Sequence, residues 1–410
     1  MNEAMLKQAL ASFQTPFYLF DTDEAAETVR KLKSALGGRA EICYAVKANP
    51  FLALPLRETA DAFEACSPGE FRICRRAGIP TEKLVLSGVY KNRDDVYAAL
   101  ELCGTGLLCT VESPEQWHLF ADWAAAHGKP VRVLLRLTAG NQFGMDEETL
   151  RGLLEEREKT LLRVEGIQFF SGTQKHSPGH AAKELERLDD LLDGLKLECG
   201  YTAERLEYGP GLPVDYFSGD AETELPQTQA LAEQLGKLRF RGKLVLEMGR
   251  RIAARCGSYC VTGVDLKQSG GTRWGITDGG IHQLGYYGQM LGMKHPQLLH
   301  PEETGGEKIP WTVCGALCTA NDVLVRDCLL AGLRTGDRLI FGKAGAYSMT
   351  ESPALFLSRD LPEIVLYSEK DGLRSARHRY QTDRLNAGSG KDQDQYGTAS
   401  LNSEGNQSGQ

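Results

Sequence analysis

The sequence has few of the features that mark membrane, secreted or nucleic-acid-binding proteins. No stretch approaches the roughly 18 apolar residues of a membrane span, and the first residues do not place an apolar segment after a basic one, as a secretory signal does. The formal charge of -8 argues against nucleic acid as a partner, and we interpret the basic cluster Arg72, Arg75 and Arg76 as a solvated helix face. We therefore expect a cytoplasmic protein that binds neither membranes nor nucleic acid.

The sequence also lacks the cysteine spacing of a zinc site or of a disulfide framework. Its 11 cysteines are scattered, odd in number and never arranged as C-x-x-C. We expect free thiols in a reducing compartment and no bound metal. At 410 residues, 41% of them hydrophobic, the chain is long enough to bury a large core and to form two domains.

Short apolar runs alternate with helical segments along the first two thirds of the chain. This rhythm predicts a (β/α)8 barrel. An open doubly wound sheet is the competing fold, but no G-x-G-x-x-G fingerprint opens the first strand–helix turn. The predicted barrel strands lie near Ile42–Lys47, Ala62–Ala65, Leu84–Ser87, Gly106–Thr110, Val131–Leu137, Val164–Phe170, Leu206–Gly209 and Leu244–Glu247.

Beyond Arg250 the helical rhythm weakens and strand-like segments interleave with glycine and proline. We predict a barrel domain over residues 25–255 and a mainly β domain formed by residues 1–24 together with 256–380. Residues 383–410 are rich in Ser, Gly, Asn, Gln and Asp, so we expect a disordered tail.

Lys47 is the most informative residue, because it closes a run that otherwise reads as a buried strand. A buried ammonium must be paired, deprotonated or used covalently. In a barrel, polar residues at strand ends share one rim, which would place Lys47 with the turn Gly209-Pro210-Gly211 and with Glu247 and Arg250. These groups suit pyridoxal phosphate: a lysine for its aldehyde, an acid for its pyridinium nitrogen, and a glycine turn with an arginine for its phosphate. We expect burial to lower the pKa of Lys47.

An ordered series of motifs resembles the fold-type III pyridoxal-phosphate decarboxylases, the family of diaminopimelate, ornithine and arginine decarboxylases. The resemblance covers roughly residues 15–367 and implies a barrel with a C-terminal β domain, assembled as a head-to-tail homodimer with shared active sites. The motifs are Tyr44–Asn49, Phe63–Glu70, Gln142–Gly144, Ser171–Gln174, Glu247–Arg250, Cys314–Asp322 and Gly345–Tyr347.

The resemblance assigns a role to each matching position. Lys47 resembles the lysine that bonds to the cofactor, and Cys318 resembles the cysteine that the neighbouring subunit supplies as an acid. Asp322 would help to bind the substrate end. The implied cofactor contacts are Phe170, Thr173, Gly209, Gly211, Glu247, Arg250 and Tyr347.

Several departures from the family pattern bear on the substrate. Thr319 stands where decarboxylases of diamino acids have an acidic residue, and a neutral hydroxyl cannot balance the distal ammonium of such a substrate. Phe170 replaces a histidine that stacks on the cofactor ring. Pro210 interrupts a Gly-Gly-Gly turn and removes one backbone N–H, and Met248 replaces a proline.

These departures resemble the branch that serves natural-product assembly, including decarboxylases of carrier-tethered glutamyl groups and of citrate-conjugated amino acids in siderophore pathways. We predict decarboxylation of an L- or D-amino acid or an amino-acid conjugate, either a small molecule or carrier-bound. Three alternatives stay open: decarboxylation of a free diamino acid, an amino-acid racemase of the same fold, and a non-catalytic homologue that binds the cofactor. A racemase would have no need of Glu247 or of the Cys318 motif, and a non-catalytic homologue would be expected to have lost Lys47 or Cys318.

Overall fold

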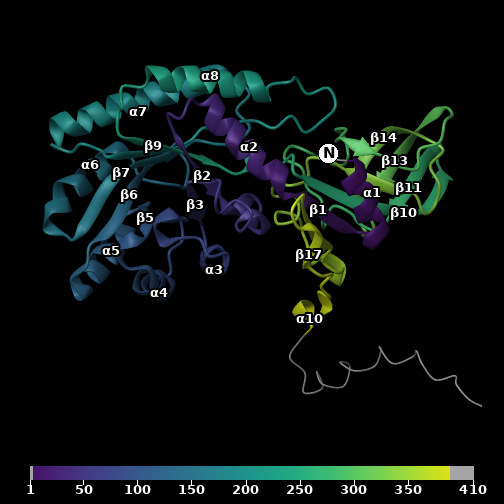
Figure 1. Ribbon diagram of the computed structural model, residues 1–410, viewed down its shortest axis with the longest axis horizontal. Helices are drawn as coiled ribbons and strands as arrows, with labels where there is room; N and C mark the ends of the chain where they lie inside the picture. The colour runs from purple at the N-terminus through teal and green to yellow at the C-terminus, as the bar shows by residue number, and fades with distance from the viewer. Residues whose placement is uncertain (1–2, 388–410) are drawn as a thin grey trace, which may run out of the picture.

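The structure is a computed structural model that describes residues 3–387. Two β structures organise it, a closed barrel and a separate nine-stranded sheet, which lie side by side in Figure 1. Within the described residues, no helix is both long enough and apolar enough to cross a membrane.

Eight strands close the barrel in sequence order, and each pairs in parallel with the next. Their side chains are mostly buried, because helices cover a parallel barrel on the outside and side chains fill it on the inside. The strands confirm the predicted (β/α)8 barrel and exclude the open doubly wound sheet. They are β2 (Glu41–Ala45), β3 (Ala62–Ala65), β4 (Leu84–Leu86), β5 (Leu108–Val111), β6 (Val131–Leu137), β7 (Leu162–Phe170), β8 (Arg205–Gly209) and β9 (Lys243–Met248).

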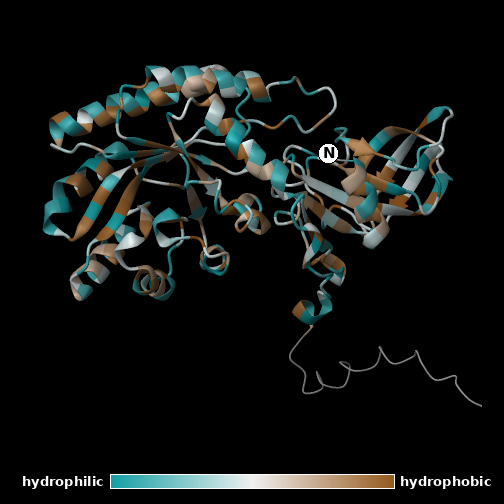
Figure 2. Cartoon of the chain, viewed as in Figure 1, coloured by the Kyte–Doolittle hydropathy of each residue, from teal (hydrophilic) through white to brown (hydrophobic). Residues whose placement is uncertain are grey.

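The barrel helices begin where the sequence offers capping side chains. Asp21, Ser67, Asn92, Ser113 and Asp146 each accept backbone N–H groups of the helix that follows. Hydrophilic and hydrophobic residues alternate along the outer helices, as expected of helices with one face in water (Figure 2). The helices are α2 (Thr22–Ala35), α3 (Pro68–Arg76), α4 (Arg93–Cys103), α5 (Pro114–His127), α6 (Glu147–Glu156), α7 (Pro178–Glu198), α8 (Glu224–Lys237) and α9 (Arg250–Ala253).

The second sheet combines the start of the chain with its last third. Strand β1 pairs antiparallel with β10 and parallel with β16, so the first segment of the chain ties the two parts together. Helix α1 (Glu3–Ser12) precedes this strand. The sheet consists of β1 (Phe17–Asp21), β10 (Gly257–Ser269), β11 (Thr272–Thr277), β12 (Leu298–Leu299), β13 (Lys308–Cys314), β14 (Val323–Ala331), β15 (Arg338–Phe341), β16 (Glu363–Ser368) and β17 (Gly372–Arg377).

The segment predicted as a disordered tail falls mostly outside the described residues. Its first residues form a short helix, α10 (Asp383–Asn386). Residues 388–410 lie beyond the part of the chain that the structure describes.

Candidate active site

Lys47 lies at the C-terminal rim of the barrel, directly after β2. The strand ends at Ala45, and Lys47 belongs to the 3-10 turn η1 (Val46–Ala48), so the expectation that Lys47 ends the strand itself is wrong by two residues. Strand β2 lies between β3 and β9, with Ala45 opposite Glu64 and Cys43 opposite Glu247. This register brings one carboxyl group from each neighbouring strand to the lysine.

Both carboxyl groups contact the lysine amine. Lys47 Nζ lies 2.6 Å from Glu64 Oε2 and 3.1 Å from Glu247 Oε1, and it also lies 3.6 Å from Cys66 Sγ. The side chain of Glu64 is 1% exposed and that of Glu247 is 8% exposed, so water screens these charges poorly. The Lys47 side chain is only half-buried, at 37% exposed, and its amine is paired, which is one of the solutions predicted for it.

The pKa values of these groups follow from burial and from their mutual charges. Burial lowers the pKa of Lys47, but the charges of Glu247 and Glu64 outweigh burial and raise that pKa well above its ordinary value. Our expectation of a lowered lysine pKa is therefore wrong for this arrangement. Burial and the neighbouring charge of Glu64 raise the pKa of Glu247 to about 8. Burial opposes ionisation of Glu64, yet the Lys47 ammonium holds the pKa of Glu64 below its ordinary value.

Arg250 forms a second centre of charge on the same rim, at the start of α9. The residue is 7% exposed; its Nε donates to Thr173 Oγ1 at 3.2 Å and its Nη1 donates to the Tyr216 hydroxyl at 3.1 Å. The guanidinium carbon also lies 4.5 Å from the ring centre of Tyr347 and 4.9 Å from that of Tyr287. Within the described residues, no carboxylate lies within ion-pair distance of Arg250. A buried cation surrounded by neutral hydroxyl and aromatic groups fits a bound anion.

The glycine turn after β8 lies against the loop that carries Thr173. Gly211 has a φ of +62°, and a Cβ atom there would lie 2.1 Å from the carbonyl oxygen of Gly172. A Cβ atom on Gly209 would lie 2.4 Å from the ring of Phe170. The chain therefore needs glycine at both positions, because the backbone and the ring approach too closely for any side chain.

Phe170 and Tyr347 bring aromatic rings to this rim. Phe170 ends β7 and is half-buried beside Gly209, its partner in the neighbouring strand. Tyr347 has a positive φ of 65°, and its backbone N–H donates to the carbonyl of Ala48, next to Lys47. A non-glycine residue in this conformation is held by its surroundings, as is common at functional sites. The predicted cofactor contacts thus come from the ends of β7, β8 and β9 and from the loop after β15.

The Cys318 motif lies in the other part of the molecule, in the loop between β13 and β14. Cys318 is exposed, whereas Asp322 is 2% exposed. The Asp322 oxygens accept the backbone N–H groups of Ile281 at 2.8 Å and Leu317 at 2.7 Å. Asp322 therefore folds the loop that presents Cys318.

Three residues near the site carry no role in the sequence-based assignment. Glu64 lies within a predicted strand and within the motif Phe63–Glu70 but has no assigned role there, although it makes the shortest contact to Lys47. Tyr216 comes from the loop between β8 and α8, and Tyr287 from the loop after β11. Irregular loops give no periodic signal, so only the fold could bring these two tyrosines to Arg250.

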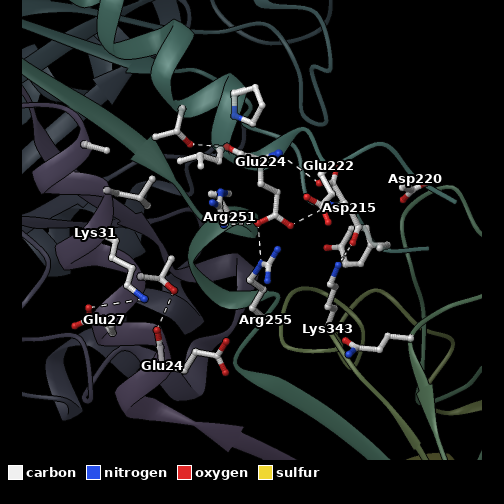
Figure 3. Close-up of a pocket in the computed structure, with 18 of the residues that line it drawn as sticks. Glu24, Glu27, Lys31, Asp215, Asp220, Glu222, Glu224, Arg251, Arg255 and Lys343 are labelled. Carbon is white, nitrogen blue, oxygen red and sulfur yellow. Dashed lines mark hydrogen bonds and ion pairs between the residues drawn. The ribbon is translucent and has the colours of Figure 1, made fainter. Parts of the chain in front are cut away.

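A cavity of about 980 Å³ lies beside the site, between α2, α9 and the loop from β8 to α8. Figure 3 shows the Glu224 carboxylate between Arg251 and Arg255, with Lys343 directed toward Asp215. Glu224 Oε2 lies 2.6 Å from Arg251 Nη1 and 2.7 Å from Arg255 Nε. These arginines are already paired, in contrast to Arg250, so this network anchors the loop that carries the glycine turn.

The comparison with known protein families agrees with this geometry. Residues 22–254 match the family described as "Pyridoxal-dependent decarboxylase, pyridoxal binding domain". The chain belongs to this family. It is a lyase that uses pyridoxal phosphate to decarboxylate its substrate. Lys47, Glu64 and Glu247 all lie within the matched residues.

Individual decarboxylases match over nearly the whole chain. The L-glutamyl-[BtrI acyl-carrier protein] decarboxylase of Niallia circulans is 26% identical over 395 residues, covering 89% of this chain and 92% of the relative. The diaminopimelate decarboxylase of Zymomonas mobilis is also 26% identical, over 398 residues, covering 91% of this chain and 92% of the relative. The crystal structure of the Helicobacter pylori diaminopimelate decarboxylase complexed with L-lysine has a TM-score of 0.81 at 23% identity, covering 93% of this chain and 98% of that one, which shows the same fold.

The residues present fit pyridoxal phosphate. Arg250 is a buried cation without a carboxylate partner among the described residues, and the Gly211 turn packs against the loop whose Thr173 hydroxyl accepts the Arg250 Nε–H. Lys47 directly follows β2, and Glu247 lies in the neighbouring strand β9 on the same rim. The residues at the barrel rim therefore agree with the cofactor that the family match implies.

Proposed function

We propose that this decarboxylase acts on an amino acid held in a conjugate or tethered to a carrier protein, and releases carbon dioxide and an amine. The observation that carries the proposal is Thr319, next to Cys318, where no carboxylate is available to pair with the distal ammonium of a free diamino acid. Asp322 does not compensate, because its oxygens are buried against backbone N–H groups. The similarity to a decarboxylase of a carrier-bound glutamyl group supports the same conclusion.

In this proposal the barrel rim holds the cofactor. Bound pyridoxal phosphate supplies an electron sink for the charge left at Cα when carbon dioxide leaves. Glu247 faces the pyridine nitrogen, and Phe170 lies against the ring face. Arg250, Thr173 and Tyr347 hold the phosphate together with the turn at Gly209 and Gly211. Lys47 provides the amine that binds the aldehyde carbon and yields it to the substrate amine.

We further propose that two copies of the chain share their active sites. Cys318 is exposed on the β domain and belongs to a different part of the molecule from the Lys47 contacts. A second copy would bring its Cys318 to the barrel rim, where the thiol or Lys47 returns a proton to Cα. In this arrangement Thr319 of the second copy lines the place where the side chain of the substrate ends.

Measuring carbon dioxide release over a substrate panel tests the proposed specificity. The panel contains free diaminopimelate, lysine and ornithine, free glutamate, a glutamyl group on a carrier protein, and citrate-conjugated amino acids. We expect kcat/KM on a conjugated or carrier-bound substrate to exceed that on every free diamino acid. Strong turnover of free diaminopimelate or lysine would overturn the proposal and favour the activity of the diaminopimelate decarboxylases.

The variant Lys47→Ala tests the proposed cofactor lysine. We expect this variant to lose the visible absorbance of the lysine-bound cofactor and to yield no cofactor-labelled peptide after borohydride reduction. The matched control is Lys91→Met, because Lys91 is also a half-buried lysine on the barrel rim but donates only to neutral oxygens. An unchanged absorbance spectrum in Lys47→Ala would refute the assignment of Lys47.

A further inference from the structure

Glu64 is the closest charged partner of Lys47, and no cofactor contact accounts for it. Its Oε2 atom lies 2.6 Å from Lys47 Nζ, and its side chain is 1% exposed. Glu247 Oε1 lies 3.1 Å from the same nitrogen, so the two carboxyl groups share one amine. The lysine amine therefore lies between Glu64 and the acid proposed for the pyridine nitrogen.

The charges in this cluster favour one proton beyond those on the lysine. An ionised carboxylate can only accept hydrogen bonds, and the two carboxyl groups share a single ammonium as their charged donor. Two ionised carboxylates beside a single ammonium would also leave a net negative charge in a poorly solvated place. One shared proton leaves the three groups neutral overall.

The distances indicate which carboxyl group holds that proton. Glu64 is 0.5 Å closer to Lys47 Nζ than Glu247 is, at 2.6 Å against 3.1 Å, so ionised Glu64 gains more from the ammonium. The proton then belongs to Glu247. The directions of the two pKa values agree with this assignment, since that of Glu247 is raised and that of Glu64 is lowered.

We propose that Glu64 holds Lys47 as an ammonium and accepts its proton when the lysine binds the cofactor, while Glu247 keeps its own proton for the pyridine nitrogen. The inference rests on the proposed roles of Lys47 and Glu247. The ammonium must lose a proton before the amine can attack, and that N–H bond breaks as the Glu64 O–H bond forms. Lys47 then forms a C–N bond to the aldehyde carbon, and the aldehyde oxygen leaves as water. When the substrate amine displaces Lys47, Glu64 returns the proton.

Glu247 cannot take over this task once the cofactor is in place. In the proposed function Glu247 faces the pyridine nitrogen, which leaves Glu64 as the carboxylate next to Lys47. Cys66 is the other polar contact of the amine, at 3.6 Å, and burial raises the pKa of its thiol well above the ordinary value. The thiol is therefore a poor acceptor at neutral pH.

The first experiment measures how fast the full-length protein, stripped of cofactor, binds added pyridoxal phosphate covalently at pH 7. The readouts are the rise of visible absorbance and, after borohydride reduction, the mass of the peptide that contains Lys47. We expect Glu64→Gln to slow this reaction about 100-fold, the contribution of a positioned acid–base group. Glu64→Asp keeps the charge and should restore part of the rate.

Glu70→Gln is the matched control for this experiment. Glu70 lies six positions further along the chain and accepts the backbone N–H of Cys66 at 2.7 Å, a contact that an amide oxygen can preserve. We expect this variant to bind the cofactor at the wild-type rate. If Glu64→Gln does not fold, Glu64→Ala replaces it, since a wild-type rate in a variant without this carboxylate would overturn the proposal.

The second experiment detects the shared proton by infrared spectroscopy of the same cofactor-stripped protein. The wild type should show the carbonyl band of a protonated carboxyl group that disappears as the pH rises through about 8. Glu64→Gln removes the neighbouring like charge, so the band should titrate at least one pH unit lower. Glu70→Gln should leave it unchanged.

The outcomes separate this inference from the proposed function. Covalent binding of the cofactor by Lys47→Ala would remove the basis of both. If Lys47→Ala fails to bind but Glu64→Gln binds at the wild-type rate, only the role of Glu64 is refuted. Equal slowing of Glu64→Gln and Glu70→Gln would also refute it, because the loss would then be structural.

Discussion

Arg250 differs from the other arginines of its neighbourhood in having neutral partners. It donates to Thr173 and Tyr216, whereas Arg251, the next residue, forms a 2.6 Å ion pair with Glu224. Leaving a cation buried without an anion is costly. A phosphate group bound at this position removes the cost, so cofactor affinity should depend on Arg250 and not on Arg251.

We predict that Arg250→Gln weakens binding of pyridoxal phosphate by about 2 kcal/mol, or roughly 30-fold, the value of a hydrogen bond to a charged group. Binding of pyridoxal, which lacks the phosphate, should change little. Fluorescence titration of the cofactor-stripped protein with both compounds measures the difference. Arg251→Gln should lower the unfolding midpoint and leave the affinity near wild type. Equal losses for both compounds in Arg250→Gln would contradict a phosphate contact.

The raised pKa of Glu247 predicts how stability depends on pH in the cofactor-stripped protein. Between the ordinary carboxyl pKa near 4.5 and the folded value of about 8, the folded state holds a proton that the unfolded state has lost. The free energy of unfolding should therefore fall as the pH rises through this window, by up to about 1.4 kcal/mol per pH unit. Urea unfolding of wild type and Glu247→Gln at pH 5, 6, 7 and 8 measures the slope. The variant should have the flatter dependence; identical slopes would count against a protonated Glu247.

The lysine and the acid on the barrel rim could be predicted from sequence, but the residues that connect them could not. Lys47 and Glu247 close apolar runs, and strand ends of a barrel meet at one rim. Glu64 also lies in an apolar run, yet its distance to the lysine depends on the register of β2 and β3. Asp322 was assigned to the substrate because sequence cannot show that its oxygens turn toward backbone N–H groups.

The loop between β8 and α8 supplies the glycine turn at its start and is tied down at its end. Gln174 on the preceding loop donates to the carbonyl of Val214 at 3.0 Å and accepts its N–H at 2.7 Å. Further on, Glu224 holds Arg251 and Arg255. The phosphate side of the site is thus built from two crossing loops, and Gly211 lies where they touch.

We predict that Gly211→Ala lowers the affinity for the cofactor more than a substitution that only strains the backbone does. The added Cβ would lie 2.1 Å from the carbonyl oxygen of Gly172 and would also occupy a positive φ. The matched control is Gly219→Ala in the same loop, where φ is +89° and nothing lies within 4 Å of the added Cβ. In the control, backbone strain should lower the free energy of unfolding by about 1–3 kcal/mol, while the affinity for the cofactor stays near the wild-type value. Calorimetric titration with pyridoxal phosphate compares them; equal affinities would contradict a phosphate cradle at Gly211.

The barrel strands were easier to predict from sequence than strand β14 and helix α8. Strands of a parallel barrel are buried on both faces, so they read as continuous apolar runs between helices. Strand β14 contains Arg326 and Asp327, and Asp327 has a φ of +50°, which interrupts the expected pattern. Helix α8 carries Pro226 in its first turn and a polar sequence after it, so its helical signal is weak.

The arrangement of the whole chain places the two proposed proton-transfer residues in different parts of the molecule. Lys47 follows a barrel strand, and Cys318 lies between β13 and β14, which Figure 1 shows in the sheet on the side remote from the barrel. The two-part organisation could be predicted from the change of rhythm after Arg250. The homodimer with shared active sites follows only from the resemblance to the family and stays a prediction, because a sequence pattern does not show which surface closes an active site.

We predict that two inactive variants restore activity when their subunits mix. Lys47→Ala lacks the cofactor lysine and Cys318→Ala lacks the proposed acid, so each homodimer has two defective sites. In a mixed dimer one site combines two altered residues, whereas the other combines wild-type Lys47 with wild-type Cys318. Random mixing gives one half mixed dimers with one intact site of two, so activity should reach about a quarter of the wild-type value. Carbon dioxide release after unfolding and refolding the variants together measures this recovery, with each variant refolded alone as the control. Activity no higher than the average of the two separate variants would show that both residues act within one chain, or that Cys318 takes no part in the reaction.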